Sequence, residues 1–197
     1  MPLARVLRSA TGDPGSWEDV SGIIATATNP RGLIEYKGNL YISASLPGQH
    51  AAGAGIGLVY CFDPSSTDYW KQVSDPGFGN SDNAEIPDFA VFNGFLYAST
   101  LNYNTGFEVW KTDGSMLPNG KYVWKRVIKD GFGDTWNQWG MTLQPFNGYL
   151  YIGTSVSGMV LKDNQPVGIR PFDVIRLDAK DRGQLLVGAP IPSDPPP

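Results

Sequence analysis

The stretch Phe92-Asn93-Gly94-Phe95-Leu96-Tyr97-Ala98-Ser99 decides the fold, because the chain contains it three times. It matches Tyr36-Lys37-Gly38-Asn39-Leu40-Tyr41-Ile42-Ser43 before it and Phe146-Asn147-Gly148-Tyr149-Leu150-Tyr151-Ile152-Gly153 after it, at steps of 56 and 54 residues. A short turn signal such as Asn-Gly, followed by aromatic and β-branched residues, is typical of a β-hairpin. Each copy therefore predicts a hairpin.

Three further motifs recur in the same order along the chain. Residues 107–113 match 172–178 and, more loosely, 58–63. The pattern Trp-x-x-Val begins at Trp17, Trp70 and Trp124, and a Gly-Phe-Gly loop occupies 75–83 and 130–137. Four motifs in a fixed order indicate a structural repeat of roughly 55 residues.

The repeats predict an all-β fold, a β-propeller built from four-stranded antiparallel blades. A β-sandwich is the alternative, although its strands would not recur with the same side chains at the same phase. The segment spans 1–189, with a half blade at 3–22, blades at about 29–74, 84–128 and 138–187, and a Pro-rich tail at 190–197.

About three and a half blades are too few for a closed ring, since propellers typically have four to eight. We therefore expect either a fragment of a larger propeller, completed by further blades, or association with a second chain. Self-assembly through unpaired strand edges is a third reading, because an exposed edge recruits other strands.

The composition excludes several classes of protein. The 197 residues carry a net charge of −4, 17% are charged and 12% are aromatic, which argues against a disordered chain and against a basic nucleic-acid binder. Cys61 and His50 are the only residues of their types, so the chain has no disulfide framework and no His/Cys zinc cluster. We expect no membrane span and see no secretory signal at the start, which leaves the compartment open.

The blade motifs resemble those of bacterial β-propellers of the Asp-box and kelch-like repeat families, over about residues 3–188. The resemblance implies structural turns at the periphery of the blades. It also raises glycosidase activity, because sialidases share the repeat type. Sialidases need three clustered arginines, whereas Glu85-Ile86-Pro87 lacks the adjacent arginine and only Arg31 and Arg170 are plausible at the rim.

A propeller gathers the loops between its second and third strands, and those between successive blades, on one face, where ligands usually bind. Here those loops are 45–56, 101–106 and 155–171, together with 74–85 and 129–140. Aromatic rings beside amides suit a glycan or peptide-like ligand. The predicted ligand-binding residues are Trp136, Trp139, Asn137, Tyr103, Asn104 and Arg170. Alternatively, Trp139 packs between blades and only Trp136 is exposed.

The Gly-Phe-Gly loops admit two readings. Their oxygen donors could hold Ca²⁺, the one cofactor considered, and the candidates are Asp75, Asn80, Asp82, Asp130 and Asp134. The structural reading, in which glycines supply positive φ and Asx side chains cap the turn, is favoured because the loop occurs twice.

The catalytic candidates are His50, Asp88 and Glu85, the last two as a possible carboxylate pair. Cys61, aligned with Trp110, is predicted to be buried and not a nucleophile. The sequence thus favours a binding or scaffold module with a polar-aromatic ligand face. The alternative is part of a propeller enzyme, whose active site further blades or a partner chain would complete.

Overall fold

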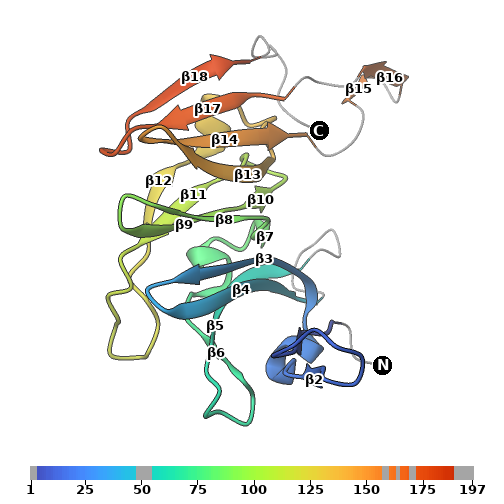
Figure 1. Ribbon diagram of the computed structural model, residues 1–197. Helices are drawn as coiled ribbons and strands as arrows, with labels where there is room; N and C mark the ends of the chain where they lie inside the picture. Colours follow the sequence, from blue (N-terminus) through green and yellow to red (C-terminus); the bar gives the residue numbers. More distant parts are fainter. Residues whose placement is uncertain (1–3, 48–54, 157–159, 163–164, 169–171, 189–197) are drawn as a thin grey trace.

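The computed structural model describes residues 4–47, 55–156, 160–162, 165–168 and 172–188 (Figure 1). Its regular secondary structure is almost wholly antiparallel β-strand, as predicted. The helical elements are single turns, namely η1 (Gly22–Thr26), η2 (Pro76–Gly79) and α1 (Asp130–Gly133).

Four strands in sequence order form the first sheet: β3 (Thr28–Tyr36), β4 (Asn39–Leu46), β5 (Ile56–Phe62) and β6 (Trp70–Gln72). The second sheet has the same order, with β8 (Phe89–Phe92), β9 (Phe95–Ser99), β11 (Val109–Thr112) and β12 (Lys125–Ile128). Both are meanders, in which each strand pairs with the next along the chain.

The third sheet contains β13 (Trp139–Phe146), β14 (Tyr149–Ser155), β17 (Val174–Leu177) and β18 (Gly183–Val187). Two short strands, β7 (Asn83–Glu85) and β10 (Leu101–Asn102), extend it to six through β13. The segment before β8 is therefore part of the third sheet and not of the second. Pro87 lies between β7 and β8, where a residue without an N–H cannot continue the ladder.

Two small hairpins complete the fold. β1 (Leu7–Arg8) pairs with β2 (Glu18–Asp19) before the first sheet. β15 (Val160–Lys162) pairs with β16 (Gln165–Gly168) between β14 and β17. Residues 4–27, which contain β1, β2 and η1, are called the N-terminal segment below.

The hairpin turns have the predicted geometry. Lys37, Asn93 and Asn147 have φ between 46 and 51°, and each is followed by a glycine with positive φ. Two consecutive left-handed residues define a type I′ turn, whose twist matches that of the flanking strands. The turn residues thus fix the register that places Tyr41, Tyr97 and Tyr151 at equivalent positions.

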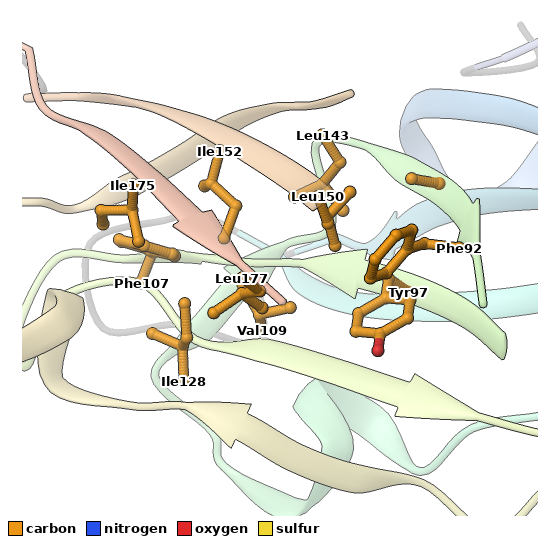
Figure 2. Packing of buried hydrophobic residues seen from close by; sticks show 11 residues of the cluster. Phe92, Tyr97, Phe107, Val109, Ile128, Leu143, Leu150, Ile152, Ile175 and Leu177 are labelled. Atoms are coloured by element: carbon orange, nitrogen blue, oxygen red, sulfur yellow. The ribbon is translucent and has the colours of Figure 1, made fainter. Parts of the chain in front are cut away.

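Three hydrophobic cores lie between successive layers of the stack. One joins the N-terminal segment to the first sheet, the next joins the first and second sheets, and the last joins the second and third. Figure 2 shows the last core, in which Tyr97 and Val109 of the second sheet meet Leu150, Ile152 and Leu177 of the third. Packing between sheets, as well as hydrogen bonding within them, therefore holds the fold together.

The register corrects one alignment. Cys61 pairs with Tyr41, as Lys111 pairs with Tyr97, so Cys61 corresponds to Lys111 and not to Trp110. Its side chain is half-buried, and burial raises the pKa of the thiol. A raised thiol pKa disfavours the reactive thiolate.

Candidate functional site

The two Gly-Phe-Gly loops adopt the same backbone conformation. Gly77 and Phe78 have φ of 55 and 56°, and Gly131 and Phe132 have φ of 58 and 65°. Left-handed phenylalanines are uncommon, and packing holds them in place here. Phe78 stacks on Trp110 at 5.1 Å and lies 4.9 Å from Trp124, measured between ring centroids.

A buried asparagine closes each loop onto the sheet that follows it. Asn83 Nδ2 donates to Gly77 O at 2.9 Å and to Glu108 Oε2 at 2.7 Å. In the next repeat, Asn137 Nδ2 donates to Gly131 O at 3.0 Å and to Asp173 Oδ2 at 2.7 Å. The two loops are thus structural connections of one design.

The residues predicted as Ca²⁺ ligands each make a separate contact within or beside these loops. Asn80 Oδ1 accepts the N–H of Asp82, and Asp134 Oδ1 accepts the N–H of Trp136, which are ordinary Asx turns. Asp75 forms an ion pair with Lys121, and Asp130 with Lys129. Over the described ranges no group of three or more His, Cys, Asp or Glu side chains could hold a metal ion. These contacts favour the structural reading of the loops.

The loop at 101–106 adjoins the loop at 129–140. Asn102 N donates to Gln138 O at 2.9 Å, Gly131 N donates to Phe107 O at 3.1 Å, and Gln138 Nε2 donates to Tyr103 O at 3.3 Å. Tyr103 is half-buried and Asn104 is exposed beside it. The structure therefore brings these two predicted ligand residues next to the segment that carries the tryptophans.

Two of the predicted ligand residues are not at the surface. Trp136 is only 7% exposed, so both readings that placed it in solvent are wrong. Asn137 is buried as well, and Gly131, Thr154 and Asp173 use its amide. The repeat explains the error: Trp136 and Asn137 belong to the loop that connects two sheets, where side chains pack between layers.

Trp139 lies half-buried at the start of β13, beneath an arginine of the first sheet. The Arg31 guanidinium carbon is 5.6 Å from the centroid of the Trp139 ring, a cation–π distance. Arg31 Nε is also 3.0 Å from Glu85 Oε2, and Asn29 Nδ2 donates to Glu85 Oε1 at 2.8 Å. Arg31, Glu85 and Trp139 form what is called the Arg31 cluster below.

The topology positions the Arg31 cluster. Leu101 pairs with both Glu85 and Trp139, so these two residues lie on strands that flank β10 at the same level. Arg31 reaches them from β3. The three residues are spaced by 54 and 54 positions (31 to 85 and 85 to 139), close to the repeat length. Their common phase is the signal that could have found this cluster from the sequence.

The electrostatics of the cluster centre on the ion pair between Glu85 and Arg31. Glu85 is buried, and within the described part of the chain its Oε2 has the ion pair with Arg31 but no aligned hydrogen bond. The Arg31 side chain is 39% exposed and contacts Glu85 through Nε. A partly exposed guanidinium held by a carboxylate is suited to binding an oxygen acceptor.

Glu85 and Asp88, which the sequence offers as a carboxylate pair, make their contacts to two different sheets. Glu85 binds Arg31 and Asn29 of the first sheet, whereas Asp88 Oδ2 accepts the N–H of Leu143 in the third sheet at 2.8 Å. Burial raises the pKa of Asp88, opposed by its hydrogen bonds from Leu143 and Phe89. His50 and Arg170 lie outside the described residues.

Two clefts open elsewhere, at the outer strands. One of about 270 Å³ lies between the first sheet and the loop before β12, beside Cys61, Lys71 and Met116. The other, of about 170 Å³, lies beside Phe78, Trp110 and Trp124. Neither cleft is lined by Arg31, Glu85 or Trp139, so both are separate from the Arg31 cluster.

No family model, curated protein or solved structure matches this chain. Among the described residues, none of the helical turns is long or apolar enough to cross a membrane.

Proposed function

We propose that the chain is a β-propeller segment that acts as a binding module, with its ligand face at the Arg31 cluster. The support for a propeller is the repetition itself: three four-stranded meanders stack through equivalent faces and are joined by equivalent loops. Meanders repeated around an axis are the architecture of that fold. The three residues of the cluster lie on β3, β7 and β13, which belong to three successive repeats of the sequence.

The observation that carries the proposal is the arrangement of Arg31, which is paired with the buried Glu85 and lies over the ring of Trp139. An arginine fixed in this way presents its donors without losing further side-chain freedom on binding. The adjoining Asn104 and Tyr103 add an amide and a phenol ring. This combination suits a glycan, whose hydroxyl or carboxylate oxygens accept from Arg31 while a sugar ring packs on an aromatic face.

The same observations favour binding over catalysis. Glu85 is committed to Arg31 and Asn29, and Asp88 to the backbone of Leu143. A general acid/base needs a free carboxyl within reach of the reacting group. The two acids lie against different sheets, so the cluster lacks the paired carboxylates that a glycosidase of the usual kind requires.

A glycan array probed with the purified chain tests the proposal, followed by calorimetry with any oligosaccharide that binds. We expect Arg31→Ala and Trp139→Ala to weaken binding by roughly tenfold or more, in line with the loss of an interface hot spot. Lys71→Ala, at an exposed lysine of β6 away from the cluster, is the matched control and should bind as the parent does. Selective binding to a peptide array instead would replace the glycan as ligand, and loss of binding in the control would refute this site.

A further inference from the structure

The third sheet presents to solvent the face that the first two sheets bury. The strand pairing defines four equivalent positions in each four-stranded sheet. Two lie on the first hairpin, at the last residue of the first strand and at the tyrosine of the second strand. The other two are the first valine of the third strand and the residue of the fourth strand that pairs with this valine. In the first sheet these are Tyr36, Tyr41, Val59 and Val73, and in the second they are Phe92, Tyr97, Val109 and Ile128. All eight side chains are buried between sheets.

The corresponding residues of the third sheet are Phe146, Tyr151, Val174 and Val187, called the receiving face below. Phe146 is 60% exposed and Val187 is 56% exposed, and Tyr151 and Val174 are half-buried. By contrast, Tyr41 and Tyr97 are 2% and 0% exposed. All four side chains are therefore more exposed than their counterparts in the other two sheets, and Phe146 and Val187 stand in solvent, which is the mark of an interaction surface.

The N-terminal segment carries the complementary half of such an interface. Val6 N donates to Ser21 Oγ at 2.8 Å, as Val59 N donates to Ser74 Oγ at 2.9 Å. Val20 N donates to Val6 O and Val73 N to Val59 O, both at 2.9 Å. The hairpin β1–β2 is therefore the outer half of a further repeat.

This equivalence assigns a position to Trp17 and Leu7, called the leading edge below. Trp17 corresponds to Trp70 and Trp124, and Leu7 corresponds to Tyr60 and Trp110. Those four residues pack against the preceding layer of the stack, whereas Trp17 is 53% exposed and Leu7 is 50% exposed.

Two tryptophans of this series also bond to the layer before them. Trp70 Nε1 donates to Val20 O at 2.8 Å, and Trp124 Nε1 donates to Val73 O at 3.1 Å. Both acceptors are the fourth-strand valine that bonds to the third-strand valine of its own layer, Val20 to Val6 and Val73 to Val59. In the third sheet Val187 pairs with Val174 in the same way, so Val187 O is the equivalent acceptor.

We propose that a second copy of this chain docks on the receiving face through its leading edge, with Trp17 Nε1 of one copy donating to Val187 O of the other. The contact continues the two interfaces already present in the chain, because both halves of the repeated pattern occur at opposite ends of the stack (Figure 1). A contact between two different surfaces is heterologous, so the copies add head to tail, either in an open series or in a closed ring.

Sedimentation velocity of the full chain from about 2 to 200 µM tests the proposal, since mass action makes such association concentration-dependent. We expect oligomers of the parent chain. Tyr151→Asp removes only the receiving face and Trp17→Asp removes only the leading edge, and each should raise the concentration needed for association by at least about tenfold. Circular dichroism melts in dilute solution check that both variants fold.

Mixing the two variants gives the decisive result. The Trp17→Asp chain keeps its receiving face and the Tyr151→Asp chain keeps its leading edge, so one productive contact remains possible. We expect a 1:1 dimer that grows no further. Leu33→Asp, at an exposed leucine of β3 outside both surfaces, is the matched control and should associate as the parent does. A monomeric parent at the highest concentration, equal disruption by Leu33→Asp, or a mixture that stays monomeric would each overturn the proposal.

Discussion

Asn137 donates its side-chain amide to the carboxylate of Asp173 at 2.7 Å, with both residues almost fully buried. Thr154 Oγ1 donates to the carbonyl oxygen of the same amide at 2.8 Å and accepts the N–H of Asp173 at 2.8 Å. The link therefore ties the loop before the third sheet to two strands of that sheet. Asn83 and Glu108 repeat it one layer earlier, also at 2.7 Å.

We expect Asn137→Ala to lower the free energy of unfolding by about 2–3 kcal/mol. The substitution removes the hydrogen bonds that Asn137 Nδ2 donates to the buried carboxylate of Asp173 and to Gly131 O, of which the first is charge-assisted. Urea denaturation followed by tryptophan fluorescence measures the change. Asn104→Ala, at an exposed asparagine, should change stability by no more than about 0.5 kcal/mol. Equal effects of the two substitutions would contradict the structural role of the link.

Substitution of two glycines that have nearly the same φ separates the cost of backbone strain from the cost of a steric clash. Gly94 has φ of +79° with open space where a Cβ would lie, whereas a Cβ at Gly106, at φ of +84°, would come within 2.7 Å of Gly131 N. We expect Gly94→Ala to cost about 1 kcal/mol, from the left-handed conformation alone. Gly106→Ala should cost clearly more, because its neighbour is backbone that cannot turn away. Thermal unfolding of both variants checks the order, and a smaller effect at Gly106 would show that the two loops can separate without loss.

The antiparallel strands and the recurring hairpin turns followed from the sequence, because turn chemistry and repeat phase are local properties. The burial of Trp136 did not follow. Its loop reads as a polar turn, yet packing between the second and third sheets buries the ring, and a tertiary contact of this kind leaves no local pattern. The pairing of β7 with β10, which places Glu85 in the third sheet, is likewise set by tertiary pairing and not by the local sequence.

The Arg31 cluster illustrates what repeat phase can and cannot supply. Its residues share one phase of the repeat, which predicts that they lie at equivalent levels of neighbouring layers. That Arg31 crosses to Glu85 and Trp139 depends on the bulges in β3, between Thr28 and Arg31 and between Arg31 and Ile34. A bulge re-aims the side chains around it, and its position is set by the pairing partner and not by the strand's own sequence.

The half-buried Asp88 predicts a pH dependence of stability. Burial raises its pKa, so the folded state binds the proton more tightly than the unfolded chain does. Its contribution to stability is therefore full below the unfolded pKa and is lost as the pH rises through the folded pKa. We expect Asp88→Asn, which keeps an acceptor for Leu143, to gain stability relative to the parent as the pH rises from about 3.8, the ordinary value of the carboxyl pKa, through its raised folded pKa. Urea midpoints of both proteins across that range measure the difference, and a gap that is constant with pH would contradict it.

The hydrogen bonds that Trp70 and Trp124 donate to the preceding layer predict unequal losses of stability from the same conservative substitution. Trp70→Phe and Trp124→Phe each keep an aromatic ring but remove the indole donor to the preceding layer. Val73 O, the acceptor for Trp124, also accepts the N–H of Tyr122 at 2.9 Å and stays satisfied, so we expect a loss below about 1 kcal/mol there. The loss at Trp70 should reach about 1–2 kcal/mol, because the bond to Val20 O anchors the N-terminal segment.

Hydrogen exchange should then show faster exchange in residues 4–20 of Trp70→Phe and unchanged exchange there in Trp124→Phe. Trp17→Phe, measured in dilute solution, is the control without a layer before it, and an equal loss in all three variants would mean that the ring size, and not the hydrogen bond, holds the layers together.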